Sequence, residues 1–141
     1  MVFWIINGPN LNLLGKREAS IYGDTSFDEY LDTLRESFPS HKILHYQSNH
    51  EGSIIDKLQE VHENSDGIIL NAAAYTHTSI AIADCVAAIT CTVVEVHLSN
   101  IEKREKFRKK SYLKRVCQKT IQGKGLKGYD KAIQWLVKQA K

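Results

Sequence analysis

Apolar runs alternate along the chain with segments whose apolar residues recur at helical spacing. Continuous apolar or β-branched runs, typical of buried strands, lie at 2–6, 42–47, 67–70 and 92–98, with a weaker one at 120–122. Amphipathic helical patterns lie at 27–38, 53–64, 78–88 and 129–140, and Thr25 or Ser26 is placed to cap the first. Because strands and helices alternate, we predict one α/β domain over 1–141: a doubly wound, five-stranded parallel sheet with helices on both faces.

Polar segments follow the ends of the predicted strands, at 7–12, 48–52, 71–78 and 97–100. In a parallel sheet of this kind ligands bind beyond the carboxyl ends of the strands, so a site is expected at that edge. Asn71 and His77 offer donors there, and the start of the following helix favours an anion. Each segment alone is explained by helix capping, but several at one edge favour a polar, anionic ligand.

Two polar residues interrupt the fourth predicted strand. Glu95 and His97 are two positions apart, so their side chains share one face, and Val94, Val96 and Leu98 take the other. A carboxylate beside an imidazole raises the imidazole pKa and fixes its orientation, which suits a general acid near neutral pH. A structural ion pair is the alternative.

The segment 14–24 is polar and bounded by Gly15 and Gly23, which is compatible with a lid over the ligand. Tyr22 lies in it, and a tyrosine acts as a base only where a cation stabilises its phenolate. Arg17 is close enough in sequence to do so. From position alone, an ordinary surface loop is the simpler interpretation.

Composition narrows the class of protein. With 43% apolar residues and two prolines among 141, a disordered or fibrous chain is excluded. The longest nearly apolar run, 85–94, is far shorter than the ~20 residues that cross a bilayer, so no membrane partner is expected. The cysteines at 85, 91 and 117 lack CxxC spacing and the histidines are scattered, which argues against a disulfide framework or a metal site and favours the cytoplasm.

Charge is divided unevenly along the chain. Residues 1–100 carry 5 basic and 13 acidic side chains, whereas 101–141 carry 14 basic and 3 acidic. Such a basic segment suggests a polyanion partner, although Lys and Arg side chains that merely solvate surface helices are the simpler interpretation. It lacks the interleaved aromatic residues of single-strand binders, so no nucleic acid is expected.

Gly123, Gly125 and Gly128 have the spacing of a dinucleotide-binding loop. They follow the last predicted strand rather than the first, and no further strand–helix unit comes after them. We therefore interpret them as the turn into the final helix. A flavin- or nucleotide-binding module of the same topology stays open as an alternative function, with the Asn- and Ser-rich strand ends holding a phosphate.

Six ordered motifs carry a resemblance to a known family. They are NGPNLNLLG (7–15), RE (17–18) with IYG (21–23), QSNHEG (47–52), NAAAYTHTS (71–79), EVHLSN (95–100) and RExFR (104–108) ahead of SY (111–112). On these motifs, which span nearly the whole chain, the sequence resembles the type II 3-dehydroquinate dehydratases. The resemblance implies a flavodoxin-like fold and dehydration of 3-dehydroquinate to 3-dehydroshikimate in the shikimate pathway of aromatic amino acid biosynthesis, with no cofactor or metal.

The resemblance also implies a mechanism, an anti elimination through an enolate. Tyr22 would be the base, kept as a phenolate by Arg17 in a loop that closes over the substrate. Asn10 would stabilise the enolate through an ordered water. His97 would protonate the departing hydroxyl, and Glu95 would orient His97.

Substrate binding and assembly follow from the same resemblance. It implies substrate contacts from Asn71, His77, Leu98, Ser99 and Arg108. It places Asp84 in the site of a neighbouring subunit, within trimers packed into a dodecamer. The rest of the basic segment 101–141 would then face acidic residues of a neighbour, and we expect high salt to weaken such an assembly.

Two departures from the family pattern concern positions without a catalytic role. Ala72 stands where the family usually has proline, and Lys109 and Lys110 where it often has histidine. Ala72 is expected to loosen the backbone after Asn71 and to weaken substrate binding slightly.

Overall fold

The computed structural model describes residues 1–16, 20 and 24–141 of the chain. The strands are β1 (Val2–Asn7), β2 (Lys42–Gln47), β3 (Gly67–Asn71), β4 (Val93–His97) and β5 (Lys119–Gln122). The longer helices are α2 (Phe27–Ser37), α3 (Glu51–Val61), α4 (Ile80–Ala88) and α5 (Lys127–Gln139). Short 3-10 helices are η1 (Leu11–Leu13), η2 (His62–Asn64), η3 (Ala73–His77), η4 (Ile101–Lys103) and η5 (Lys106–Arg108).

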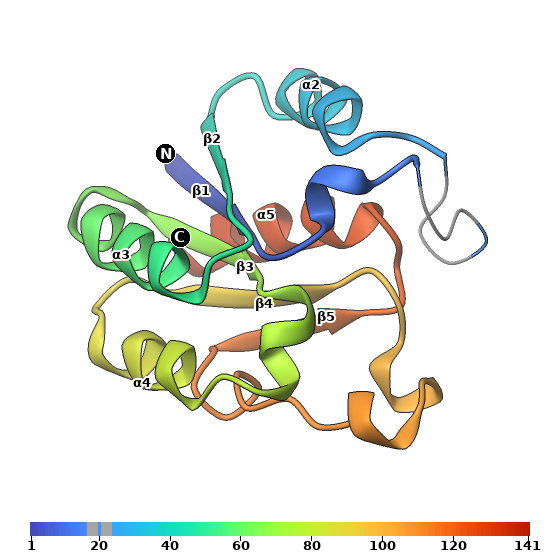
Figure 1. The fold of residues 1–141 in the computed structure, drawn as a ribbon. Coiled ribbons are helices and arrows are strands. Elements are labelled where there is room, and N and C mark those ends of the chain that lie inside the picture. Colours follow the sequence, from blue (N-terminus) through green and yellow to red (C-terminus); the bar gives the residue numbers. More distant parts are fainter. Residues whose placement is uncertain (17–19, 21–23) are drawn as a thin grey trace.

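The strands form one parallel sheet in the order β2-β1-β3-β4-β5 (Figure 1). This is the flavodoxin-like order, in which the chain winds from β1 to one edge and then to the other. It confirms the predicted five-stranded, doubly wound sheet. The winding reverses between β1 and β3, where Asn7 pairs with Asn71 in register. Two asparagines therefore meet at the place where ligands bind in such sheets.

Helices cover both faces of the sheet, as predicted (Figure 1). The side chain of Ile5 packs with α2 and α5 on one face, and that of its neighbour Ile6 packs with α3 and α4 on the other. Both faces being buried explains why the strands are continuous apolar runs. None of the helices in the described part of the chain is long and apolar enough to span a membrane.

The four helices occur where the periodicity predicts them, and side-chain caps set the start of two, α2 and α4. Ser26 caps α2: its hydroxyl accepts from the N–H of Glu29, whose side chain accepts from the N–H of Ser26. Helix α4 begins at Ile80 rather than at 78, because the Ser79 hydroxyl accepts from the N–H of Ile82 and the residues before it form η3. Cys85 and Cys91 are free and buried in the core.

The predicted turn into the last helix is confirmed, and it also holds the end of β4. Gly123 and Gly125 have φ of 73° and 56°, values that favour glycine. The N–H of Gly123 donates to the carbonyl of Ser99, and that of Gly125 to the carbonyl of Leu98. The turn after β5 thereby fixes the backbone that leaves β4 at the carboxyl edge.

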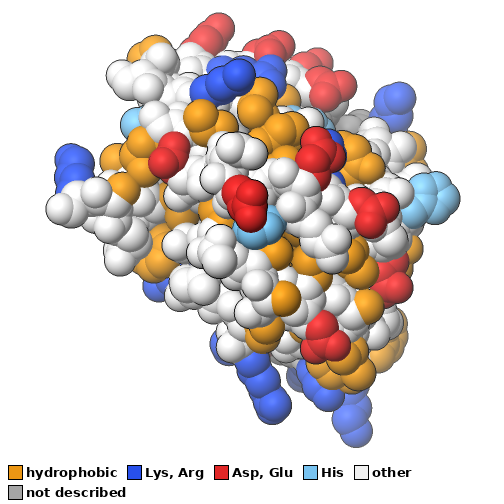
Figure 2. Space-filling model, turned by 90° about the vertical axis from the view of Figure 1, so that its left-hand side faces the viewer, with side chains coloured by type: hydrophobic (Ala, Val, Ile, Leu, Met, Phe, Trp, Pro, Cys, Tyr) orange, Lys and Arg blue, Asp and Glu red, His pale blue; other side chains and the backbone are white. Residues whose placement is uncertain are grey.

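The two ends of the sheet differ in what they present. Figure 2 looks onto the amino ends of the strands, where acidic side chains are scattered and most of the visible Lys and Arg lie toward the margins. The carboxyl edge lies on the opposite side, at the right of Figure 1. There the segments that follow β1, β3 and β4 meet η5, and they enclose the cavity described next.

Candidate active site

A cavity at the carboxyl edge of the sheet gathers most of the residues predicted to act. Among its lining residues are Asn10, Asn71, His77, His97, Leu98, Ser99 and Arg108. They follow β1, β3 and β4 or lie in η5, so the sheet order brings together residues up to 98 positions apart in the sequence. Glu95 lies behind His97, fully buried. The predicted residues Arg17 and Tyr22 lie outside the described residues.

Glu95 and His97 form a buried, hydrogen-bonded pair on the face of β4 that alternation predicts. The Nε2 atom of His97 lies 2.6 Å from Oε1 of Glu95, and the two side chains are 5% and 0% exposed. With Nε2 donating to the carboxylate, Nδ1 is the ring nitrogen left for a ligand, and His97 is also a lining residue of the cavity. The carboxylate fixes the tautomer and orientation of the imidazole.

Three hydroxyl groups complete the surroundings of the Glu95 carboxylate. Thr76 donates to Oε1 at 2.7 Å, Ser111 also donates to Oε1, and Thr120 donates to Oε2 at 2.9 Å. Burial by itself raises the pKa of Glu95, but the hydrogen bonds and charge of His97, with those of Ser111 and Thr76, lower it to about 2. Glu95 therefore stays ionised across the physiological range.

His77 lies beside this pair in its neutral form. Its Nδ1 is 2.7 Å from the carbonyl oxygen of Lys110, which makes Nδ1 the protonated nitrogen and leaves Nε2 as an acceptor. Burial lowers the pKa of His77, and the charges of His97 and Arg108 lower it further, against the opposing effects of Lys110 and Glu95. His77 is thus suited to accept a hydrogen bond from a ligand hydroxyl.

The ends of β1 and β3 are pressed together beneath the cavity. A Cβ atom at Gly8 would lie 2.4 Å from the carbonyl oxygen of Ala72, so only glycine fits there. Ala73 has φ of 52°, an unusual value for alanine, and its N–H donates to Oδ1 of Asn71. Asn10, at φ 69°, donates its own N–H to Oδ1 of Asn49. The backbone here is fixed tightly around the two asparagines that line the cavity.

Arg104 is a lining residue that the sequence analysis did not assign. It follows η4, and its Nη1 donates to the hydroxyl of Ser99 at 3.1 Å. Arg108 is the last residue of η5, and both arginines pair with the exposed Glu105, at 3.5 Å for Arg104 and 3.3 Å for Arg108. The cavity thus has two guanidinium groups and suits an anionic ligand. Arg104 lies in the same RExFR motif as Arg108, and this motif is the feature of the sequence that could have identified Arg104 as a site residue.

Asp84 is the predicted site residue that lies apart from this cavity. It is on the exposed side of α4, with Ile80, Ala81, Ala87 and Ala88, which are exposed too. Apart from Asp84, this helix is therefore apolar on its outer side as well as its inner side.

Among the described residues no three His, Cys, Asp or Glu side chains are grouped so as to hold a metal ion.

Comparison with known proteins gives one consistent result. A family model described as "Dehydroquinase class II" matches residues 1–137. The 3-dehydroquinate dehydratases of Bacillus pumilus and Campylobacter jejuni are 47% and 45% identical, over 97% of this chain and 95% and 87% of theirs. The crystal structure of a type II dehydroquinase from Butyrivibrio crossotus matches with a TM-score of 0.93 at 46% identity, covering 97% of both chains. The chain belongs to the class II dehydroquinase family.

Proposed function

We propose that the protein dehydrates 3-dehydroquinate to 3-dehydroshikimate in the shikimate pathway. The observation that carries this proposal is the buried Glu95–His97 pair, which lies at the wall of a cavity with two arginines. The elimination of water from a ring that carries a hydroxyl and a carboxylate requires a general acid for the hydroxyl. It also requires cationic groups that bind the carboxylate. The relatives named 3-dehydroquinate dehydratase support the choice of substrate.

His97 is the general acid of this mechanism. Its imidazolium, stabilised by ionised Glu95, gives the Nδ1 proton to the departing hydroxyl, which leaves as water. The electrons for this step come from the enolate that forms when a base removes the proton next to the ring ketone. Asn10, at the cavity wall after β1, stabilises the enolate oxygen through a water.

Tyr22 is the proposed base, and Arg17 the cation that keeps it as a phenolate. Both belong to the segment 14–24 of the sequence, between Gly15 and Gly23. Leu14, the first residue of this segment, is one of the lining residues of the cavity. A base that comes from a covering segment also excludes water from the enolate.

Substrate binding falls to the polar groups around the cavity. Arg108 and Asn71 hold ring oxygens, and His77 accepts a ring hydroxyl. The backbone and hydroxyl of Leu98-Ser99 receive the carboxylate. The described cavity and the chemistry of these groups need no cofactor or metal for the elimination.

We further propose a cytoplasmic dodecamer built of trimers. The support is the outer side of α4, which exposes Ile80 and three alanines around its one charged residue, because an exposed apolar surface of this kind is typical of an interface. Asp84 lies on that side, where a neighbouring subunit would cover it and where it would reach the neighbour's site. Size-exclusion chromatography with light scattering at low and high salt tests the assembly and its salt dependence.

The proposed function is tested by following the ultraviolet absorbance of the conjugated product after 3-dehydroquinate is added to the purified protein. We expect turnover by the wild type and loss of nearly all kcat in Tyr22→Phe, with substrate binding retained. Tyr46→Phe, on β2 and away from the cavity, is the matched control and should behave as the wild type. Absence of turnover by the wild type would overturn the function. A Tyr22→Phe variant with most of its rate would remove Tyr22 as the base.

A further inference from the structure

A row of four polar side chains runs through the core toward the cavity. Nδ2 of Asn71 donates to the hydroxyl of Tyr129 at 3.0 Å, and that hydroxyl donates to Oδ1 of Asn7 at 2.7 Å. Nδ2 of Asn7 lies 3.2 Å from Nε2 of His45. The first three side chains are at most 3% exposed. The row links β3, α5, β1 and β2, and only its Asn71 end lines the cavity.

The hydrogen bonds of this row all point the same way. The Nδ2 groups of both asparagines donate toward His45. The Tyr129 hydroxyl accepts from Asn71 and donates to Asn7, so it continues the same direction. An amide nitrogen can only donate, so Nε2 of His45 has to be the unprotonated ring nitrogen. Burial raises the pKa of Tyr129, against the effect of its two amide partners, so its hydroxyl keeps the proton that it donates.

The direction of the row decides what Asn71 presents to a ligand. Its Oδ1 accepts from the N–H of Ala73 at 3.2 Å, and one hydrogen of Nδ2 goes to Tyr129. The remaining hydrogen of Nδ2 has no acceptor among the described residues and is on a side chain that lines the cavity. Asn71 is therefore fixed as a donor, and a rotated amide would present an acceptor in its place.

His45, at the far end, is held in the form that the row needs. Its ring packs on Phe27 with centroids 4.6 Å apart, and Asp28 and Arg35 of α2 are the charged groups that act on it. Burial lowers the pKa of His45, Asp28 raises it, and Arg35 lowers it, with a net lowering. A neutral imidazole with Nε2 as acceptor is thus the stable form near pH 7.

We propose that Tyr129, with Asn7 and His45 behind it, is a positioning residue that keeps the Asn71 amide turned so that it donates a hydrogen bond to the substrate. This inference rests on the proposed function for the identity of the substrate. It goes beyond that function because none of these three residues touches the cavity. A protonated His45 would donate rather than accept, and it would reverse the row as far as Asn71.

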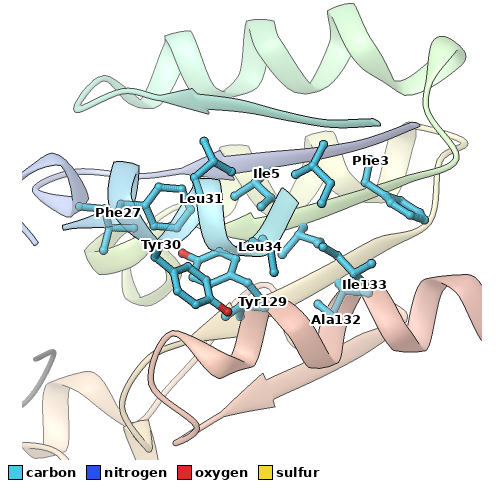
Figure 3. Packing of buried hydrophobic residues seen from close by; sticks show 14 of the residues in the cluster. Phe3, Ile5, Phe27, Tyr30, Leu31, Leu34, Tyr129, Ala132 and Ile133 are labelled. Atoms are coloured by element: carbon cyan, nitrogen blue, oxygen red, sulfur yellow. The ribbon is translucent and has the colours of Figure 1, made fainter. Parts of the chain in front are cut away.

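The direct test is Tyr129→Phe, with Tyr30→Phe as the matched control. The two rings lie side by side between α2 and α5, with centroids 6.3 Å apart (Figure 3). The buried Tyr30 hydroxyl has no hydrogen-bond partner among the described residues. Tyr30→Phe therefore removes a buried hydroxyl as Tyr129→Phe does, but it leaves the hydrogen bonds of the row intact. We expect Tyr129→Phe to raise KM about tenfold with kcat within about twofold, the size of one lost hydrogen bond. Equal KM values in the two variants would overturn the proposal.

A second readout does not depend on turnover. The ¹⁵N side-chain amide signal of Asn71, assigned by its loss in Asn71→Ala, should shift in Tyr129→Phe and stay in place in Tyr30→Phe. An unmoved signal contradicts the proposal even if the enzyme is active. If the signal shifts in Tyr129→Phe but the wild type does not turn over 3-dehydroquinate, the positioning role is supported and only the proposed function is overturned.

The His45 end gives an independent arm, which also applies if Tyr129→Phe does not fold. His45→Gln keeps an acceptor for Asn7 and should retain the wild-type KM at pH 7, whereas His45→Leu removes it and should raise KM several-fold. Lowering the pH from 7 to 5 should raise KM more in the wild type than in His45→Gln, because only the histidine becomes a donor. Identical pH profiles, or identical KM values for the Gln and Leu variants, would contradict the role of His45.

Discussion

Oε1 of Glu95 lies 2.6 Å from Nε2 of His97, within the hydrophobic sheet and beneath the cavity. Because the carboxylate is ionised and the pair is almost entirely buried, the imidazole is held in one orientation. The pair therefore supplies two things that a general acid uses, a fixed direction and an ionised partner within hydrogen-bond distance.

Replacing Glu95 with glutamine keeps the shape of the side chain and removes its charge. We expect Glu95→Gln to lower kcat about 10²- to 10³-fold, within the range that general acid catalysis contributes, because the His97 imidazolium loses its partner. Steady-state kinetics at pH 7 measures this. Glu102→Gln, at an exposed position in η4, is the control. A Glu95→Gln enzyme of nearly normal rate would reduce the pair to a structural role.

The same carboxylate makes stability depend on pH. The pKa of Glu95 is lowered to about 2 in the folded protein from an ordinary value of 4.5. Its stabilising effect is complete above about pH 4.5 and is lost as the pH falls toward 2. Between pH 7 and 3 the wild type should lose about 2 kcal/mol of unfolding free energy that Glu95→Gln does not lose. Urea unfolding of both proteins measures the difference, and parallel pH profiles would contradict it.

Arg104 should contribute to substrate affinity although it was not predicted as a site residue. A guanidinium group bound to an anion through charged hydrogen bonds contributes about 1.5–3 kcal/mol. We expect Arg104→Ala to raise KM about 10- to 100-fold. Lys103→Ala removes an exposed cation next to it and should leave KM unchanged. If both variants match the wild type, Arg104 only supports Ser99.

Proline at position 72 should stabilise the protein. Ala72 has φ of −74°, which is close to the value that a proline ring imposes, and it follows an extended strand residue. Ala72→Pro is expected to add about 0.4–1 kcal/mol by restricting the unfolded chain. Thermal unfolding measures the change, and Ala87→Pro in α4 should be strongly destabilising. A lower melting temperature in Ala72→Pro would contradict the prediction, because it would mean that the folded backbone at position 72 does not accommodate a proline ring.

Most of the fold is present in the periodicity of the sequence. Strand and helix positions follow from apolar runs such as 67–70, because a sheet covered on both faces needs continuous apolar strands. The order of the strands follows from right-handed crossovers only in part, and the resemblance to a family supplied it. The start of α4 shifted because the Ser79 hydroxyl caps it, whereas α3 and α5 begin two residues earlier than predicted without a side-chain cap.

The candidate site was predicted less evenly. Residues at strand ends, such as His97 and Asn71, follow from the topology. Thr76, Ser111 and Thr120 did not, because hydroxyl groups are common in loops and only the three-dimensional fold shows that they meet on one carboxylate. Tyr129 was predicted only as part of an apolar helix stripe. Its hydroxyl bonds Asn7 on β1 and Asn71 on β3, and only the three-dimensional fold brings these partners to it.

The partners of Glu95 also have a bearing on how the chain is made. Two of its three hydroxyl partners, Ser111 and Thr120, are synthesised well after it, and β4 is an edge strand until β5 pairs with it. A nascent chain that ends before 120 would have to leave a charged side chain in a sheet that cannot yet satisfy it, which opposes its burial. The last quarter of the chain therefore completes the sheet and the Glu95–His97 pair together. A ribosome-bound fragment without β5 should have neither the complete sheet nor the buried pair.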